Sequence, residues 1–278
     1  MANANYAINI YGFTFTHTAE RAARELSDLG FNCIELMMYP GHLWPPEMDA
    51  GQRASFKTLL NERNMTVRSV NQPNVDINIA AAAPEMREHS LKMVGRMVET
   101  AGEYGADYVI LGPGKVNGLM AMSSDKMMEH LYRGLDHLVP MAQKYNTQIL
   151  VENMPFAFIP DVESLMQAVD GYGSDDVGVI YDLANGAFVG EDALTSLRRC
   201  ESRLKLIHVS DTGSKIYRHD PIGQGTMDFA LLGRQLAEFG WKHAPVLEVI
   251  GHSDDPGAEM VASARKLDAL GWDKINPS

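Results

Sequence analysis

The sequence predicts an α/β fold, a single (β/α)8 TIM barrel that extends over residues 1–278. Three observations favour it. Short apolar segments alternate with amphipathic helical patterns eight times along the chain. No low-complexity linker interrupts this alternation. Eight β-then-α units in 278 residues are typical of a closed barrel with its helices outside.

The predicted strands are short and mostly apolar, as expected for parallel strands covered on both faces. In chain order they are Tyr6–Gly12, Phe31–Met37, Met65–Asn71, Asp107–Gly112, Gln148–Asn153, Val177–Asp182, Leu204–Ser210 and Pro245–Ile250. The predicted helices between and after them are Ala19–Leu29, Met48–Asn64, Pro84–Tyr104, Ser124–Tyr145, Val162–Val169, Ala193–Cys200, Phe229–Phe239 and Ala258–Leu270. Left-handed residues that commonly end helices are expected at Gly30, Gly105, Gly240 and Gly271.

The main rival fold is an open, doubly wound sheet. Such a sheet normally has a glycine-rich phosphate-binding turn after its first strand. Here the first strand is followed by Gly12-Phe13-Thr14-Phe15, which is no such turn. The barrel is therefore favoured.

Composition excludes several classes of protein. The net charge of −12 argues against nucleic acid and anionic membranes as partners, because both require a basic surface. The only two cysteines, Cys33 and Cys200, form no ligand-like pair, so neither a disulfide framework nor structural zinc is expected. No signal peptide is evident in Met1–Asn5, and no run approaches the ~18 apolar residues of a membrane span. We expect a cytoplasmic protein.

Four predicted strands in the second half of the chain each end in one acid or imidazole. These residues are Glu152, Asp182, His208 and Glu248. A buried charge is costly unless it has a partner, and four at equivalent strand ends suggest a shared one. Catalytic groups of such barrels collect at these strand ends. Three carboxylates and one imidazole predict one divalent metal ion, with Mn²⁺ as first choice and Co²⁺ or Mg²⁺ as substitutes.

Each of the four residues also has a simpler interpretation. Asp182 could cap the turn that follows it, and His208 could be a hydrogen-bonded core histidine. Glu152 and Glu248 could each pair with an arginine. All of these interpretations would have to hold together, so the metal site is the favoured hypothesis.

Five short motifs in the second half carry a resemblance to a known family. They are Val151-Glu152-Asn153, Tyr181-Asp182-Leu183-Ala184-Asn185, Ile207-His208-Val209-Ser210-Asp211, Arg218-His219-Asp220-Pro221-Ile222-Gly223-Gln224-Gly225 and Leu247-Glu248. With Gly30-Phe31-Asn32-Cys33-Ile34-Glu35, they resemble the xylose-isomerase-like superfamily. Within it, the chain is most similar to the sugar epimerase and isomerase branch, which includes ketose 3-epimerases and inosose-processing enzymes.

The resemblance implies roles for individual residues. In that family the residues matching Glu152, Asp182, His208 and Glu248 bind one divalent metal, and the two glutamates also transfer protons. The arginine matching Arg218 holds substrate oxygens. Ketose 3-epimerases usually have a substrate-contacting histidine three residues after the metal aspartate, where this chain has Asn185.

The related apurinic endonucleases use a three-zinc cluster with extra histidines after the third, fourth and sixth strands. At these places the chain has Asn71-Gln72, Gly112-Pro113 and Asn185. With its acidic net charge, the chain is not expected to be a DNA-repair nuclease.

The expected chemistry begins with removal of a proton next to a carbonyl. The metal would stabilise an enediolate, and Glu152 and Glu248 would act as base and acid on opposite faces of the substrate. We therefore expect an isomerase or epimerase of a keto-sugar or related polyol. The main alternative is a lyase, either an inosose-type dehydratase or an enzyme that eliminates from a 3-keto-glycoside. A non-catalytic sugar-binding subunit also stays open.

Further candidate substrate contacts are Arg218, Asn185, His219 and Glu35. Arg218 could clamp substrate oxygens with its planar fork, and Glu35 could either orient substrate or pair with a neighbouring strand. The loop after the eighth strand, which often helps to bind phosphate in such barrels, is acidic. An unphosphorylated sugar or cyclitol is therefore the expected substrate, and a homo-oligomer is possible.

Overall fold

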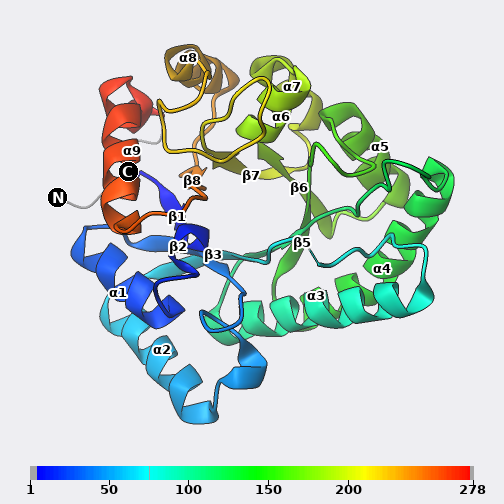
Figure 1. Ribbon diagram of the computed structural model, residues 1–278, viewed down its shortest axis with the longest axis horizontal. Coiled ribbons are helices and arrows are strands. Elements are labelled where there is room, and N and C mark those ends of the chain that lie inside the picture. Colours follow the sequence, from blue (N-terminus) through cyan, green and yellow to red (C-terminus); the bar gives the residue numbers. More distant parts are fainter. Residues whose placement is uncertain (1–4, 75, 276–278) are drawn as a thin grey trace.

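The computed structural model describes residues 5–74 and 76–275 and is a closed barrel of eight parallel strands with helices outside (Figure 1). The strands are β1 Ala7–Asn9, β2 Cys33–Met37, β3 Thr66–Asn71, β4 Tyr108–Leu111, β5 Gln148–Glu152, β6 Val177–Asp182, β7 Leu204–Val209 and β8 Val246–Leu247. The barrel closes where Ala7 of β1 pairs with Val246 of β8. The predicted barrel is confirmed, while its predicted limits, residues 1 and 278, lie outside the described residues.

All eight predicted helices are present, with ends shifted by a few residues at most. The helices are α1 Ala19–Asp28, α2 Ala50–Glu62, α3 Pro84–Tyr104, α4 Ser124–Lys144, α5 Val162–Tyr172, α6 Leu183–Val189, α7 Ala193–Cys200, α8 Phe229–Phe239 and α9 Pro256–Ala269. The four glycines expected after helices all have positive φ. No helix in the described part of the chain has the length and apolar character needed to cross a membrane.

The additional helix is α6, which begins directly after β6. Asp182 caps it, since one carboxylate oxygen accepts a hydrogen bond from the backbone N–H of Asn185 at 2.8 Å. The Asn185-Gly186 pair near the start of α6 normally indicates a loop turn, and for this reason the sequence did not predict this helix.

Most strands are one or two residues shorter than predicted, and β1 and β8 are shorter by four. β1 ends at Asn9, and a 3₁₀ helix, η1 Tyr11–Phe13, replaces the predicted continuation to Gly12. The Asn9 side chain accepts a hydrogen bond from the backbone N–H of Tyr11 at 2.7 Å, which turns the chain away from the sheet. β8 retains only Val246–Leu247 of the predicted Pro245–Ile250.

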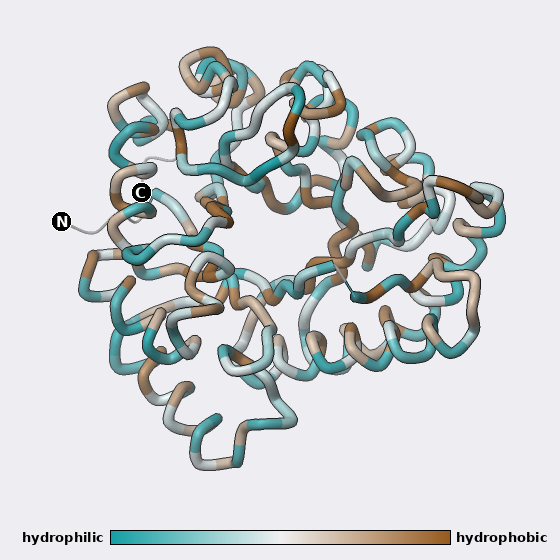
Figure 2. The backbone as a smooth tube through the Cα atoms, in the orientation of Figure 1, coloured by the Kyte–Doolittle hydropathy of each residue, from teal (hydrophilic) through white to brown (hydrophobic). Residues whose placement is uncertain are grey.

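The barrel interior consists of stacked layers, because every second residue of a strand points inward. One layer is an apolar plug of buried residues: Ala7, Cys33, Ile110, Leu150, Ile180, Leu206 and Val246. The larger hydrophobic core lies between strands and helices, and the helices alternate hydrophobic and hydrophilic stretches in Figure 2. Two residues further along six of the plug strands stand buried polar side chains: Asn9, Glu35, Glu152, Asp182, His208 and Glu248. The plug thus forms the floor of a polar layer at the barrel mouth.

Candidate metal centre

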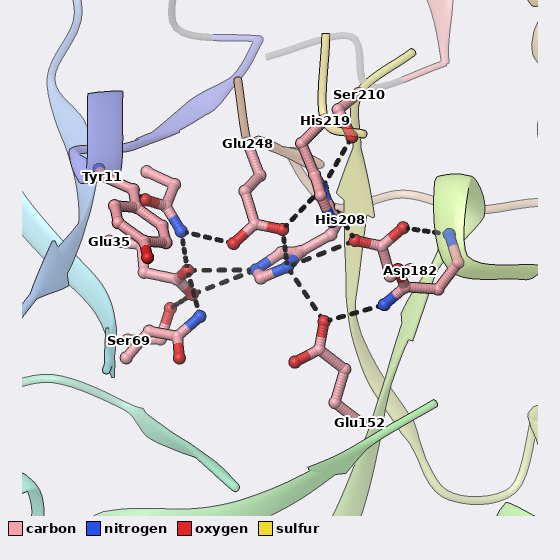
Figure 3. Close-up of polar contacts among 12 residues, drawn as sticks. Tyr11, Glu35, Ser69, Glu152, Asp182, His208, Ser210, His219 and Glu248 are labelled. Carbon is pink, nitrogen blue, oxygen red and sulfur yellow. Dashed lines mark hydrogen bonds and ion pairs between the residues drawn. The ribbon is translucent and has the colours of Figure 1, made fainter. Parts of the chain in front are cut away.

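The four strand-end residues predicted to bind a metal converge at the mouth of the barrel (Figure 3). Each offers one ligand atom, and these atoms all lie within 4.8 Å of one another. His208 Nδ1 lies 3.0 Å from Glu248 Oε2, 3.7 Å from Glu152 Oε1 and 3.8 Å from Asp182 Oδ2. None of the four residues is more than 4% exposed. They form one compact, buried group with a donor set suited to a divalent cation.

Two atoms of this group lack hydrogen-bond partners. Asp182 Oδ2 and His208 Nδ1 are buried, yet neither makes a hydrogen bond. Buried polar atoms without a hydrogen bond are rare in folded proteins, and these two lie 3.8 Å apart within the cluster. Among residues 5–74 and 76–275, no arginine lies within 4 Å of the carboxylates of Glu152 or Glu248. The arginine pairing considered for these glutamates is therefore absent there, and the residues fit a bound cation.

Glu35 of β2 determines how His208 is presented to the cluster. The Glu35 carboxylate lies 3.1 and 3.2 Å from His208 Nε2, so this nitrogen carries the proton and donates it. In the neutral ring, the lone pair is then on Nδ1, which faces the three ligand carboxylates. A carboxylate behind a ligand histidine is a common means of fixing tautomer and ring orientation.

Further polar residues hold Glu35 in place. Asn9 Nδ2 donates to Glu35 Oε1 at 2.6 Å and to Glu248 Oε1 at 2.8 Å. Asn71 Nδ2 donates to Glu35 Oε1 at 3.2 Å, and the Ser69 hydroxyl donates to Glu35 Oε2. Glu35 itself is fully buried. Its position under His208 favours a positioning role over the substrate contact considered from the sequence.

A second set of contacts leads from Glu152 to Glu248 through the loop after β7. Asn185 Nδ2 lies 3.4 Å from Glu152 Oε1, and Asn185 Oδ1 accepts a hydrogen bond from Tyr217 at 2.6 Å. The Tyr217 hydroxyl also lies 2.7 Å from His219 Nε2. His219 Nδ1 in turn lies 3.3 Å from Glu248 Oε2. Of the predicted substrate contacts, Asn185 is thus buried behind Glu152, and His219 stands beside Glu248.

A cavity of about 430 Å³ opens above the cluster. Its lining includes Glu152 and Glu248, together with His219 and Arg218. The Arg218 side chain is 62% exposed and 3.9 Å from Asp220, so most of its hydrogen-bonding capacity faces solvent and the cavity. Both glutamates proposed as acid and base therefore reach the space where a substrate would bind.

The ionisable groups of the cluster influence one another strongly. Burial raises the pKa of Glu152 to about 7 and that of Asp182 to about 6. Burial also acts on Glu248, but the charges of His208 and His219 outweigh it and lower its pKa to about 2. Burial lowers the pKa of His208, yet the carboxylates of Glu248 and Glu35 raise it well above its ordinary value. Protons and a cation would therefore compete for this site.

The sequence interpretation missed the roles of Asn9, Ser69 and Tyr217. Asn9 and Ser69 were detectable in principle, because each occupies an inward position of a strand in the same layer as Glu35. Tyr217 belongs to a loop, where no periodicity indicates the direction of a side chain.

Comparisons with known proteins identify relatives along most of the chain. A family model described as xylose isomerase-like TIM barrel matches residues 23–270. Fructoselysine 3-epimerase of Shigella flexneri is 19% identical over 243 residues, covering 83% of this chain and 85% of that protein. A probable endonuclease 4 of Oleidesulfovibrio alaskensis is 28% identical over 205 residues, covering 68% and 69%.

Solved structures share the fold at low sequence identity. A D-tagatose 3-epimerase-like protein superposes with a TM-score of 0.81 at 18% identity, covering 96% of both chains. The 3-keto-D-glucoside 4-epimerase of E. coli has a TM-score of 0.79 at 17% identity, covering 95% of this chain and 99% of that one. An IolI protein with a bound zinc atom has a TM-score of 0.79 at 16% identity, covering 98% and 99%.

Proposed function

The chain belongs to the xylose isomerase-like TIM barrel family, and we propose that it is a divalent-metal-dependent isomerase or epimerase of a keto-sugar or related polyol. The observation that carries this proposal is the cluster of Glu152, Asp182, His208 and Glu248 at the base of an open cavity. The fructoselysine 3-epimerase relative supports the reaction class. Mn²⁺ is the proposed ion, because three of the four ligands are carboxylates.

The four residues would hold the cation, with Asp182 and His208 contributing the two atoms that lack other partners. When bound, the cation would polarise a substrate carbonyl and stabilise negative charge that develops beside it. Asp182 and His208 are fully buried and do not line the cavity, whereas Glu152 and Glu248 do. Asp182 and His208 would therefore only hold the cation, whereas Glu152 and Glu248 would hold it and also face the substrate.

Glu152 and Glu248 would perform the proton transfers. Glu152 ends β5, Glu248 directly follows β8, and the two side chains lie on opposite sides of His208 (Figure 3). Each could therefore approach a different face of a bound sugar. One would remove the proton next to the carbonyl, and the other would return a proton on the opposite face. Asn185 and His219 stand next to these two carboxylates and would hold them in position. Arg218 at the cavity lining would bind substrate oxygens.

A nuclease is a weaker candidate despite the endonuclease relatives. Asn71 is bonded to Glu35, and Asn185 to Glu152 and Tyr217, so these amides orient the existing cluster. The chain also carries a net charge of −12, which opposes binding to a phosphate backbone.

Proton exchange with solvent tests the proposal. The purified protein, loaded with Mn²⁺, is incubated in D₂O with ketoses, inososes and 3-keto-glycosides, and the recovered sugars are analysed by mass spectrometry and NMR. We expect deuterium next to the carbonyl and an epimerised or isomerised product, both lost after chelation. Deuterium with an eliminated product would assign the lyase instead. Absence of exchange with every sugar would overturn the proposal.

A further inference from the structure

The cavity above the metal centre is lined by two chemically different sets of side chains. Its base is polar and carries the two glutamates and His219. Apolar side chains make up much of the remaining lining: Met37, Ile77, Met154, Phe156, Ile250 and Pro155. Sugar hydroxyl groups gain no hydrogen bonds from these side chains, which suit the C–H face of a sugar ring or an apolar substituent on it. A ligand with an apolar substituent would bury more of this lining than an unsubstituted sugar.

Phe156 is the most conspicuous member of this apolar wall. The residue is 63% exposed although it lines the cavity. Its ring stands nearly perpendicular to Tyr217, with centroids 5.5 Å apart at 82°, and lies 5.9 Å from the ring of Phe188. Tyr217 is itself bonded to Asn185 and His219 beside the proposed acid and base. The aromatic wall is thus continuous with the polar base of the cavity.

The backbone around Phe156 is fixed by the neighbouring loop. The N–H of Phe158 donates to the carbonyl of Gly114 at 3.3 Å, and the N–H of Val116 donates to the carbonyl of Phe156 at 3.5 Å. Gly114 has a φ of +121°, and a Cβ added there would lie 2.5 Å from that of Ala80. These contacts fix the backbone on either side of Phe156, and the rings of Phe188 and Tyr217 pack against its side chain. A wall ordered in this way lowers the entropy cost of binding.

We propose, on the basis of the proposed function, that the substrate is a keto-sugar carrying an aryl substituent, which packs against Phe156 while the sugar ring lies over Glu152 and Glu248. The cavity of about 430 Å³ falls in the size range of sites that enclose drug-sized ligands. Offset or edge-to-face contact with Phe156 suits a flat aromatic group. The cations Lys115 and Arg218 also line the cavity, so a sugar phosphate is the competing ligand class that the test must include.

The experiment compares matched ligands on the Mn²⁺-loaded protein. Dissociation constants of phenyl and methyl 3-keto-β-D-glucopyranoside and of a ketohexose phosphate are measured by calorimetry, and deuterium exchange from D₂O is followed for each. We expect the phenyl glycoside to bind about tenfold or more tightly than the methyl glycoside, consistent with one buried aromatic contact. Phe156→Ala should reduce this phenyl-to-methyl ratio by about tenfold.

Phe15→Ala is the matched control. Phe15 is 65% exposed and lies in the loop after β1, but it does not line this cavity. The variant should leave the phenyl-to-methyl ratio unchanged. Equal binding of both glycosides, or tighter binding of the phosphate, would overturn the inference. An altered oligomeric state of Phe156→Ala with an unchanged ratio would do so too, since the wall would then be a subunit contact. Exchange with any keto-sugar would still uphold the proposed function in each case.

Discussion

Replacing Glu35 with glutamine should weaken metal binding although Glu35 is not among the four ligands. One carboxylate oxygen accepts hydrogen bonds from Asn9 and Asn71, and the other accepts them from Ser69 and His208. Glutamine keeps the shape but replaces one oxygen with an NH₂ group. Whichever way the amide is turned, a donor then faces two donors, and the orientation of the His208 ring is no longer determined by a charged acceptor.

The expected loss of metal affinity follows from the one hydrogen bond that Glu35 makes to a candidate ligand, His208. A hydrogen bond to a charged group contributes about 1.5–3 kcal/mol. Loss of a carboxylate behind a ligand histidine typically costs about 10–100-fold in metal affinity, or roughly 1.4–2.7 kcal/mol. The two ranges agree, so we expect the dissociation constant for Mn²⁺ to rise about 10–100-fold in Glu35→Gln.

Calorimetric titration of the chelated protein with Mn²⁺ measures this change. Glu191→Gln serves as the matched control, because Glu191 also accepts two hydrogen bonds, from the N–H of Val162 and the hydroxyl of Tyr181, both at 2.8 Å. It lies outside the metal cluster, so the control should retain the affinity even if it unfolds at a lower temperature. An affinity for Mn²⁺ within twofold of the unmodified protein in Glu35→Gln would refute the assigned role of Glu35.

Three further results are expected. Glu248→Gln should keep the fold by circular dichroism but lower turnover by several orders of magnitude, since it removes a charged ligand and a proton carrier; near-normal turnover would count against the mechanism. Tyr217→Phe should lower kcat by about tenfold and change KM less, because Asn185 and His219 lose the hydroxyl between them. A loss of metal affinity of the same size would instead indicate a general structural defect. The apparent Mn²⁺ affinity should fall as the pH drops below about 7, because the raised pKa of Glu152 lets protons displace the cation. Calorimetric titrations in buffers of different ionisation enthalpy should show that Mn²⁺ binding releases protons near pH 6. An affinity that does not depend on pH would contradict the proposed metal site.

The barrel was predictable because each β-then-α unit carries its own local signals. The short apolar strands and the glycines after helices identify the units without tertiary information. Strand ends were less predictable. The turn at Asn9 that ends β1 depends on a side-chain hydrogen bond, and α6 depends on the cap by Asp182 over an Asn-Gly sequence that normally indicates a turn. Local composition cannot show whether a strand or a turn forms at Asn9, or a helix or a turn at Asn185-Gly186.

The candidate ligands were predictable for a related reason. Glu152, Asp182 and His208 each come at the end of an apolar run, and parallel strands in a barrel bring such ends to one face. The partners of these residues were harder to infer. Glu35 is also inward-facing on its strand, but whether it meets the cavity or lies beneath a ligand depends on the stagger between strands, which local sequence does not determine.

The polar layer divides the barrel into a side that provides the candidate metal ligands and a side that provides hydrogen-bonding residues around them. Strands β5 to β8 contribute or immediately precede the four candidate ligands, while β1 to β3 contribute Asn9, Glu35, Ser69 and Asn71. The supporting residues reach the ligands at two points, from Glu35 to His208 and from Asn9 to Glu248. The second contact exists because β1 pairs with β8, the pairing that closes the barrel. Closure of the barrel therefore completes the hydrogen bonding of Glu248 as well as the sheet.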